Sequence, residues 1–402
     1  MIRRLGPTAL AFTAFALAAC NSESTSSGGA SAPPAGVSCS STTTVNDAAS
    51  ASAALAAAKP GACVALGGPV SGALDVPAGV ALFGASASAT TITSDVDAAA
   101  VTLHEGSTLA RVSVTSAKRV GVAVRAANAR MSEVVVTNAK VAALAVICKE
   151  SETSGCAAGA IRLDGVELGA SALGLWASGA HVVMKGGKSE GHTSTGLTGA
   201  SGVIGVDGAK LELDGVSVSK NQGAGVLVDG ASTTLSVKSG AISENGERGV
   251  WVQRVAGTLE APAVRIEGTE LVKNRIVGVG AVESRGIIIV GGRIASTVAT
   301  PVATNLASTE DVGDGVGLFA GSTDLNLDGT HLDSNARAAA IVDGSERGII
   351  IVGGKVTAGA AGIKVVVQGK GGAEVKVPEA DRSKPAAALG VSAPKLMLPS
   401  VL

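Results

Sequence analysis

Apolar residues in this chain follow one short pattern that returns many times. A run of the form Gly-Val-x-Val is followed by a turn, a strand with alternating apolar and polar residues, a Gly and an Asn. One copy starts at Gly225, continues through the alternating strand 235–238 and ends at Asn245. The copies start 22 to 37 residues apart, at Gly121, Ala143, Gly174, Gly202, Gly225, Gly249, Gly278, Gly315, Ala339 and Gly362. A unit this short cannot bury its own apolar side, so the pattern predicts coils that stack into one solenoid.

A different pattern precedes the repeats. Residues 46–59 are rich in Ala, with Asn46 or Asp47 as the cap and Pro60 as the stop, which predicts a short helix. Strands with period-two alternation are expected next, at 64–66, 74–76 and 80–82. The ends of a stack of coils expose unpaired strand edges. We therefore expect the helix to cap the first coil and the C-terminal tail, residues 376–402, to cap the last.

The residues around this helix resemble the start of a known fold family. Pro60-Gly61-x-x-Val64-x-Leu66, followed by Gly79-Val80-Ala81-Leu82-Phe83-Gly84, is similar to the start of pectate-lyase-like right-handed parallel β-helices. The resemblance continues through the repeats to residue 367. It implies an all-β solenoid of about a dozen coils with a short N-terminal capping helix, which we assign to residues 38–375. Lyases, hydrolases, adhesins and passive structural proteins share that fold, so it implies no activity by itself.

The first residues of the chain predict export. Arg3 and Arg4 precede an apolar stretch, 5–16, that is too short to span a bilayer. Leu17-Ala18-Ala19-Cys20 then resembles the lipobox of bacterial lipoproteins, which implies a signal peptide over 1–20 and lipidation of Cys20. The alternative is an ordinary secretory signal that happens to contain a Cys.

The residues after Cys20 predict a tether. Residues 21–37 are mostly Ser, Thr, Gly, Ala and Pro, and we expect a flexible linker there. The lipoprotein resemblance implies a protein held at the cell envelope by its lipid. Asn21, next to the lipobox Cys, favours the outer membrane of a Gram-negative bacterium.

Four further cysteines remain in the exported part: Cys39, Cys63, Cys148 and Cys156. An even number of cysteines in an exported chain predicts two disulfides, with three connectivities open. We favour Cys39–Cys63 across the N-terminal cap and Cys148–Cys156 around a local loop. A metal site is disfavoured because His residues are not clustered near these cysteines.

Stacked coils place equivalent residues over one another. The Asn near the end of each repeat is expected to recur at one corner and bond its neighbours, at Asn138, Asn221, Asn245, Asn274 and Asn335. On the alternating strand, one outward column has charges of alternating sign, at Asp164, Lys185, Asp214, Lys238 and Glu267. Opposite charges on adjacent strands favour each other, so we expect this column to fix the register of the coils.

The first strand of each repeat predicts an apolar column instead. Four consecutive coils align Trp176, Ile204, Leu227 and Trp251. Trp176 and Trp251 are the only two Trp in the chain. An exposed apolar stripe usually marks a contact surface, so these four residues form a candidate binding strip for a glycan or a protein. The alternative is that a loop covers them, such as residues 149–158 or 186–200.

Charge and motifs narrow the remaining chemistry. The formal net charge is −1, which gives no electrostatic basis for binding nucleic acid. Asp324-x-Asn326-x-Asp328 is only a weak candidate for calcium, and His331-x-Asp333 beside Arg337 has no accompanying nucleophile or metal. We therefore assign no catalytic residue, no metal and no cofactor.

Two functional interpretations follow. The first is an envelope-anchored, non-catalytic β-helix lipoprotein with a binding, scaffolding or adhesive role. Its partners would be the membrane, through the lipid, and a polysaccharide or an envelope protein. The alternative is a polysaccharide-acting enzyme, a lyase, hydrolase or epimerase, with an atypical site on the outer face of the β-helix.

Overall fold

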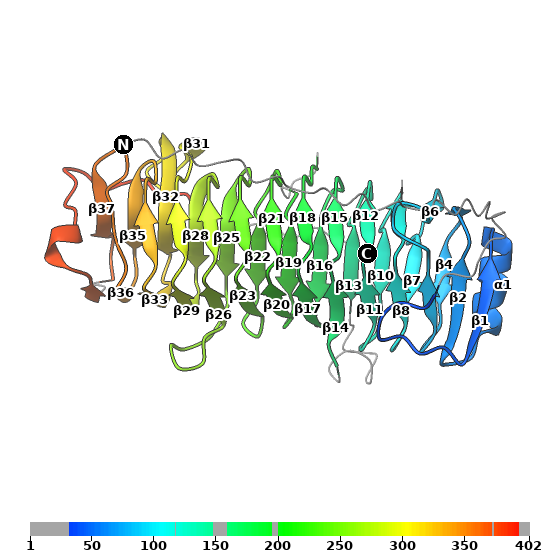
Figure 1. Ribbon diagram of the computed structural model, residues 1–402. Coiled ribbons are helices and arrows are strands. Elements are labelled where there is room, and N and C mark those ends of the chain that lie inside the picture. The colour runs from blue at the N-terminus through cyan, green and yellow to red at the C-terminus, as the bar shows by residue number, and fades with distance from the viewer. Residues whose placement is uncertain (1–31, 117, 148–158, 195–199, 372–373, 394–402) are drawn as a thin grey trace, which may run out of the picture.

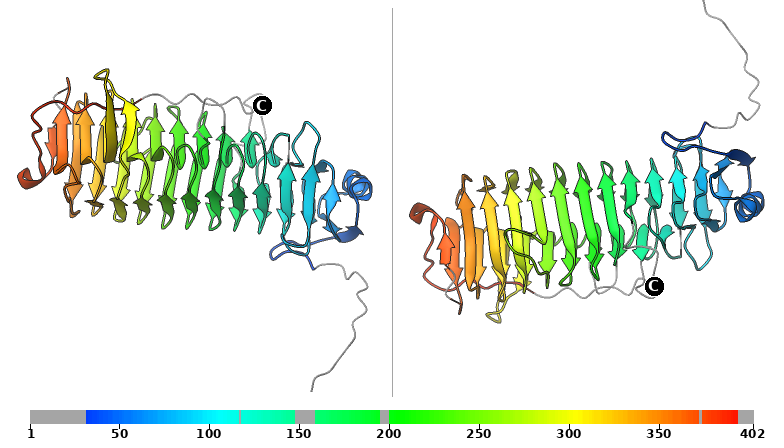
Figure 2. Two further views of the ribbon diagram at one scale, coloured as in Figure 1. Left: turned by 90° about the horizontal axis from the view of Figure 1, so that it is seen from above. Right: turned by 90° about the horizontal axis from the view of Figure 1, so that it is seen from below.

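The computed structural model describes residues 32–116, 118–147, 159–194, 200–371 and 374–393. The chain forms one elongated rod in which each coil adds a strand to three long sheets (Figure 1). Two further views show the same stack from above and below, with the helix at one end (Figure 2). Apart from one antiparallel hairpin, neighbouring strands are parallel, as the repeat pattern predicts.

We name the three sheets A, B and C. Sheet A contains β1 (Ser41–Val45), β2 (Ala62–Leu66), β5 (Ala81–Phe83), β8 (Thr108–Ala110), β11 (Arg130–Ser132), β14 (Ile161–Asp164), β17 (His181–Lys185), β20 (Lys210–Asp214), β23 (Thr234–Lys238), β26 (Val264–Glu267), β29 (Arg285–Val290), β33 (Thr323–Asp328), β36 (Arg347–Val352) and β38 (Glu374–Lys376). Sheet B contains β3 (Val70–Ser71), β6 (Thr91–Ser94), β9 (Ser113–Ser116), β12 (Val135–Thr137), β15 (Glu167–Gly169), β18 (Lys188–Glu190), β21 (Ser217–Ser219), β24 (Ala241–Ser243), β27 (Glu270–Val272), β30 (Arg293–Ala295) and β34 (His331–Asp333).

Sheet C contains β4 (Leu74–Val76), β7 (Val101–Leu103), β10 (Val122–Val124), β13 (Leu144–Ile147), β16 (Leu175–Ser178), β19 (Val203–Val206), β22 (Val226–Asp229), β25 (Arg248–Gln253), β28 (Ile276–Val282), β32 (Thr309–Phe319), β35 (Ala338–Asp343) and β37 (Ile363–Gln368). The short strand β31 (Thr300–Ala303) pairs antiparallel with β32 and forms a hairpin outside the stack. Each repeat start named above lies at, or just before, a strand of sheet C.

A helix covers the N-terminal end of the rod. The helix α1 (Ala48–Ala57) is capped by Asp47, which accepts a 2.9 Å hydrogen bond from the backbone N–H of Ser50. Ala51 and Leu55 are buried in the core of the first coils. The sequence pattern missed β1, which pairs with β2 and extends sheet A ahead of the helix. Among the described residues, no helix is long and apolar enough to cross a membrane.

Buried Asn side chains join successive coils at the corner between sheets B and C. Asn221 donates from Nδ2 to Oδ1 of Asn245 at 2.9 Å, and Asn245 donates in the same way to Asn274 at 2.9 Å. The backbone N–H groups of Asn221 and Asn245 donate to the same two oxygens. All three residues are at most 1% exposed. The expected stacking of Asn residues is confirmed for these coils.

Other residues extend the ladder at both ends. Asn335 accepts hydrogen bonds from the backbone N–H and the hydroxyl of Thr297. At the other end His192 replaces Asn: its backbone N–H donates to Oδ1 of Asn221, and its Nδ1 accepts from the backbone N–H of Ser171. Burial lowers the pKa of His192 to about 4, so this ring is neutral at physiological pH.

Asn138 does not join the ladder. It is exposed and has a left-handed backbone, with φ of 58°. Asn138 occupies the position directly before the ladder residue of its coil. In later coils this position is held by Lys220 and Glu244, which have the same left-handed backbone conformation. Ala139 takes the ladder position, and its N–H donates to Oγ of Ser171. The tolerance of Asn for left-handed backbone therefore explains Asn138 alone, whereas side-chain bonding explains the buried members.

The Gly residues that open several repeats pack against this ladder. A Cβ on Gly202 would lie 2.7 Å from Nδ2 of Asn221 and 2.8 Å from the carbonyl oxygen of Gly225. The same two conflicts arise for Gly225 and Gly249 with the coils that follow them. Gly and Asn therefore recur together because they share one crowded corner.

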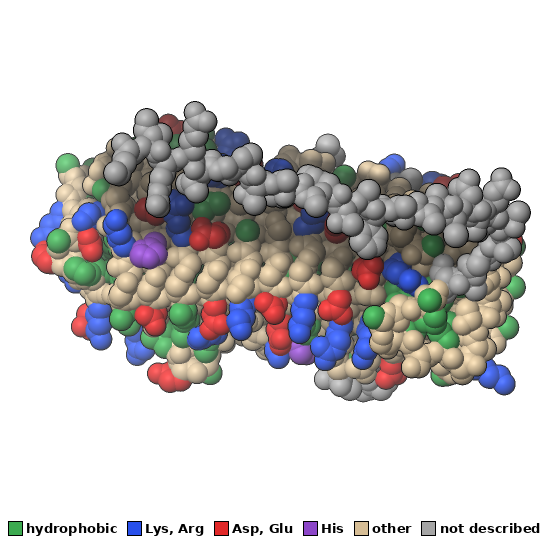
Figure 3. Space-filling model, viewed as in Figure 1, with side chains coloured by type: hydrophobic (Ala, Val, Ile, Leu, Met, Phe, Trp, Pro, Cys, Tyr) green, Lys and Arg blue, Asp and Glu red, His purple; other side chains and the backbone are tan. Residues whose placement is uncertain are grey.

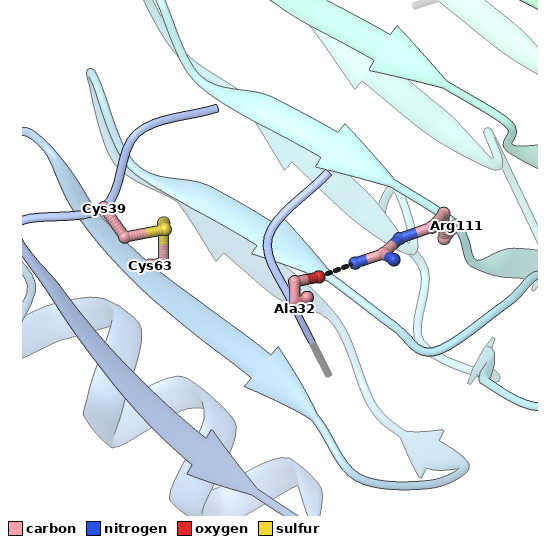
Figure 4. The surroundings of a disulfide bond; sticks show 4 residues. All are labelled: Ala32, Cys39, Cys63 and Arg111. Atoms are coloured by element: carbon pink, nitrogen blue, oxygen red, sulfur yellow. Dashed lines mark hydrogen bonds between the residues drawn. A yellow bond between two sulfur atoms is a disulfide. The ribbon is translucent and has the colours of Figure 1, made fainter. Parts of the chain in front are cut away.

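A disulfide fixes the start of the rod. Cys39 and Cys63 are bonded, with their Cα atoms 5.5 Å apart, which confirms this pairing (Figure 4). The end of the predicted linker also contacts the body: Pro34 is buried, and Arg111 donates to the carbonyl oxygen of Ala32. Cys20, Cys148 and Cys156 lie outside the described residues.

The outward column of sheet A has the expected register. Asp164 pairs with Lys185, and Asp214 and Lys238 follow in the next two coils. Figure 3 shows acidic and basic side chains alternating along the lower edge of the molecule, over sheet A. Opposite charges thus lie on adjacent strands, and their effect on the choice of register stays a prediction.

Candidate functional site

The apolar strip predicted on the first strand of each repeat is present on sheet C. Trp176 of β16 pairs with Ile204 of β19, and Ile204 pairs with Leu227 of β22. Leu227 then pairs with Trp251 of β25. The four side chains belong to an apolar cluster that is separate from the core inside the coils. The alignment of the strip is therefore as predicted.

The strip is buried, which agrees with the alternative of a covered strip and not with that of an exposed binding surface. Trp176 is 7% exposed, Ile204 and Leu227 are 2% exposed, and Trp251 is fully buried. Part of the reason is the next coil, where the column continues with Gly280. A Cβ on Gly280 would lie 2.3 Å from the Trp251 ring, so this ring fills the space that the Gly leaves.

The structure describes only part of the two loops proposed as covers, 149–158 and 186–200. Residues 149–158 lie outside the described residues, and residues 188–190 form β18 in sheet B. The described members of the cluster that come from outside the coils all belong to the C-terminal segment: Leu389, Val391 and Ala393. The tail thus contacts the outer face of sheet C and not only the end of the rod.

A cavity of about 690 Å³ opens where this segment meets sheet C. Its floor is the outer face of β25, β28, β32 and β35, and its walls are the β31–β32 hairpin and the C-terminal segment. Phe319 contributes an aromatic wall, and its ring centroid is 6.4 Å from that of Trp251. The lining residues are Glu247, Arg248, Ile276, Val302, Ala303, Thr304, Asn305, Phe319, Ala320, Asp343, Gly344, Val391, Ser392 and Ala393.

A buried cation lies in the wall of this cavity. The side chain of Arg248 is 3% exposed and forms a 2.8 Å ion pair with Glu247. Its guanidinium carbon lies 4.3 Å from the centroid of the Trp251 ring, a cation–π contact. Its Nε has no hydrogen-bond partner among the described residues. Burial lowers the pKa of Arg248, and the nearby Glu247 opposes this change.

A carboxyl group with a raised pKa lies in the same cavity. Burial raises the pKa of Asp343, and a hydrogen bond with Gln368, its neighbour on β37, opposes the rise. The cavity therefore contains one carboxyl with a raised pKa, Asp343, and one, Glu247, that is paired with a cation. They lie at opposite ends of the parallel strands: Glu247 directly precedes β25, whereas Asp343 is the last residue of β35.

The acidic and His residues considered from the sequence do not assemble into a site. Asp324 has a left-handed backbone and pairs with Arg347. Asp333 forms two hydrogen bonds, of 2.8 and 2.7 Å, with Arg293. Arg337 turns away from His331 and pairs with the buried Asp314. Among the described residues, no group of three His, Cys, Asp or Glu side chains is close enough together to hold a metal ion.

The sequence interpretation missed Arg248 and Asp343. Arg248 occupies an outward column whose next two members are Val277 and the buried Asp314. Asp343 belongs to a mixed column that also contains Gln253, Val282, Phe319 and Gln368. Neither column is apolar throughout, so neither residue stood out in the sequence, and placing them requires the register of every coil.

A smaller cavity of about 350 Å³ lies on the same face near the N-terminal end. Asp75, Thr102, His104 and Arg125 contribute its polar lining. Nε2 of His104 lies 2.6 Å from Oδ1 of Asp75, and both side chains are well exposed. This open pair has no apolar wall comparable to Phe319, so the larger cavity is the better candidate site.

Comparisons with known proteins identify the fold. A family model described as the right handed beta helix region matches residues 97–294. No curated protein has a significantly similar sequence. Among solved structures, the catalytic domain of a GH87 alpha-1,3-glucanase in complex with tetrasaccharides is similar, with a TM-score of 0.55 and 9% identity. That similarity covers 87% of this chain and 70% of the glucanase chain.

A second solved structure is similar over most of its length. The A-module of the mannuronan C-5 epimerase AlgE4 from Azotobacter vinelandii has a TM-score of 0.53 and 13% identity. The similarity covers 82% of this chain and 94% of the epimerase module. At these identities the likeness shows the fold alone. The chain is an all-β, right-handed parallel β-helix solenoid.

Proposed function

We propose that this protein binds a polysaccharide in the 690 Å³ cavity on sheet C and cleaves it there. One observation carries the proposal: the cavity combines an aromatic wall, a buried cation and a carboxyl of raised pKa. The glucanase and the epimerase with this fold are named for polysaccharide substrates, which supports a carbohydrate ligand here. The proposal therefore favours the enzymatic interpretation over the non-catalytic one.

One carboxyl group in the cavity suits glycosidic cleavage. Such hydrolysis uses one protonated carboxyl, which donates to the leaving oxygen, and one ionised carboxylate. Asp343 fits the first role because burial raises its pKa. Glu247 does not fit the second role, because it precedes β25 at the opposite end of the parallel strands from Asp343 and three strand steps away, whereas the two carboxyl groups of a glycosidase lie about 5 to 10 Å apart.

Replacing the proton donor tests this assignment. The chain from residue 21 onwards, which keeps every described residue, would be incubated with an α-1,3-glucan and with polymannuronate. We expect reducing ends to be released from one of them, and Asp343→Asn to lower this rate about 100-fold or more while sugar binding persists. Asp328→Asn, an exposed carboxylate on β33, is the matched control and should leave the rate unchanged.

The outcomes separate the two functional interpretations. Binding without product release would support the non-catalytic interpretation, which is favoured by the engagement of Glu247 with Arg248. Absence of binding to either polymer would contradict the proposed ligand class. Product release that Asp343→Asn leaves intact would remove Asp343 as the acid.

We also propose that the protein is held at the cell envelope, in the outer membrane, by lipid on Cys20. The support is the lipobox-like sequence and the position of the tether, whose last residues contact the side of the rod near its N-terminal end. In a Gram-negative host, Cys20→Ala should move the protein from the membrane fraction to the soluble fraction. A wild-type chain that is already soluble would contradict the anchor.

A further inference from the structure

Residues 389–391 are held by side chains and not by a sheet. They belong to none of the strands, yet each of their backbone N–H and C=O groups has a hydrogen bond. The N–H of Leu389 donates to Oε1 of Gln368 at 2.9 Å, and its carbonyl oxygen accepts from Nε2 of the same side chain at 2.6 Å. Gln368 is the last residue of β37, the terminal strand of sheet C.

The next two residues are bonded in the same way. The N–H of Gly390 donates to Oε2 of Glu310 at 3.1 Å, and its carbonyl oxygen accepts from Nη1 of Arg337 at 2.7 Å. The N–H of Val391 donates to Oδ1 of Asn305 at 2.9 Å, and its carbonyl oxygen accepts from the backbone N–H of Asn305 at 3.1 Å. Side chains therefore bind almost the whole backbone of this short segment.

The side chains of the segment fit the same place. Leu389 and Val391 pack in the outer apolar cluster of sheet C. The position between them is buried, and a Cβ on Gly390 would collide with Oε1 of Glu310 and Oγ1 of Thr304. Bonds to the main chain give affinity for any extended peptide, whereas the space around alternate side chains gives specificity. The arrangement therefore selects a peptide of the form apolar-Gly-apolar.

The segment is separable from the surface that binds it. Glu310 belongs to β32, and Arg337, directly before β35, donates to the buried Asp314 at 2.9 Å. These partners are thus held by the coils themselves. The residues just before the segment, 386–388, are exposed Ala residues outside any strand. Residues 389–391 can therefore leave this surface without breaking the pairing of any strand.

We propose that the four side chains around residues 389–391 form a peptide-binding site, which we call the clamp site. In this structure the chain's own segment fills the clamp site, and an extended apolar-Gly-apolar segment of a partner protein can replace it. The partner is not a second copy of this chain, because each copy's own segment already fills its site. The four side chains are those of Asn305, Glu310, Arg337 and Gln368.

Exchange at the clamp site also changes the large cavity. Residues 391–393 line the 690 Å³ cavity on sheet C, so replacement of the segment removes one of its walls. A bound partner would thereby widen the opening of the cavity. The clamp site does not rest on the proposed binding and cleavage of a polysaccharide, and its test uses no sugar.

A labelled peptide tests the clamp site in the chain from residue 21 onwards. The probe is a fluorescein-labelled peptide with the sequence of residues 387–393, Ala-Ala-Leu-Gly-Val-Ser-Ala. Gly390→Val adds the side chain that the site excludes, and Gly390→Pro also removes the N–H that binds Glu310. We expect fluorescence anisotropy to show about tenfold or tighter binding to both variants than to the wild type, in which the attached segment competes at high effective concentration.

Further variants locate the binding. Asn305→Ala, added to Gly390→Val, removes the acceptor for the third residue and should weaken peptide binding about fivefold. Leu306→Ser in the same background is the matched control, because Leu306 is an exposed residue of the same loop. A peptide with Val in place of its Gly should not bind. Faster hydrogen exchange at residues 389 and 391 in both Gly390 variants verifies that the segment has left the site.

Several results would overturn the clamp site. Absence of peptide binding to both Gly390 variants, with unchanged circular dichroism, would show that the four side chains only hold the chain's own segment. Equal binding to the wild type, or binding that Asn305→Ala leaves intact, would place the peptide elsewhere. Slow exchange that persists in both variants would contradict the exclusion of side chains at Gly390. A wild-type dimer in light scattering that the peptide dissociates would assign the exchange to a second copy.

Discussion

Replacing Asn245 with Ala is expected to lower the free energy of unfolding by about 4 kcal/mol. Oδ1 of Asn245 accepts from both the backbone N–H and Nδ2 of Asn221, and its own Nδ2 donates to Asn274 and to the carbonyl of Val218. Removing the amide leaves several fully buried polar groups without partners, and each costs about 1 to 3 kcal/mol. The change would be measured as a shift of the urea unfolding curve followed by circular dichroism.

Asn138 offers the matched control. It is exposed and left-handed, with φ of 58°, and Gly adopts that conformation readily. Asn138→Gly should therefore shift the curve by less than about 0.5 kcal/mol. Equal effects of the two substitutions would contradict a special role for the ladder. A partial unfolding step in Asn245→Ala alone would agree with it, since repeat arrays can lose cooperativity between coils.

Arg337→Met is expected to cost about 3 to 5 kcal/mol at neutral pH. Arg337 pairs with Asp314, which is fully buried, and also contacts Glu310 and the carbonyl of Gly390. Without the guanidinium, the Asp314 carboxylate remains buried and uncompensated, and the C-terminal segment loses a contact. Arg293→Met is the control, because Arg293 and its partner Asp333 form an exposed pair that is worth about 1 kcal/mol or less.

The Arg337 variant should also depend on pH. Burial raises the pKa of Asp314, and Arg337 opposes that rise, so the pKa should increase further in Arg337→Met. Between about pH 4 and that raised pKa, the folded chain binds more protons than the unfolded chain, so stability falls as pH rises through this window. The variant should be closest to wild type near pH 4. A destabilisation that does not change with pH would contradict this account.

The fold could be predicted from the sequence because the packing that produces it repeats in every coil. The copies of Gly-Val-x-Val and the later Asn report a crowded corner that every coil repeats, and this predicted the stacking of Trp176 on Ile204 and the column beginning at Asp164. The strand β1 was missed because it lies before the first recognisable copy and has no repeat partner in the sequence.

The candidate site was harder to predict because it is formed by segments that do not belong to the sequence repeat. The cavity is bounded by a hairpin inserted between β30 and β32 and by a tail that returns across the coils, and neither belongs to the repeat. Whether the strip is exposed or covered was left open for the same reason, since a repeat pattern shows which residues align but not what packs over them. Arg248 and Asp343 can be placed in the fold only by aligning strands that are separated by unequal numbers of residues along the chain.

The disulfide has a mechanical consequence. Cys39 precedes β1 and α1, whereas Cys63 lies within β2, so residues 40–62 form a closed covalent loop. Tension applied at the N-terminus passes from Cys39 through the sulfur atoms to Cys63 and into the coils behind it. The capping helix and the first strand therefore carry no load when the chain is pulled from the residues before Cys39, and they cannot be peeled from the end of the rod.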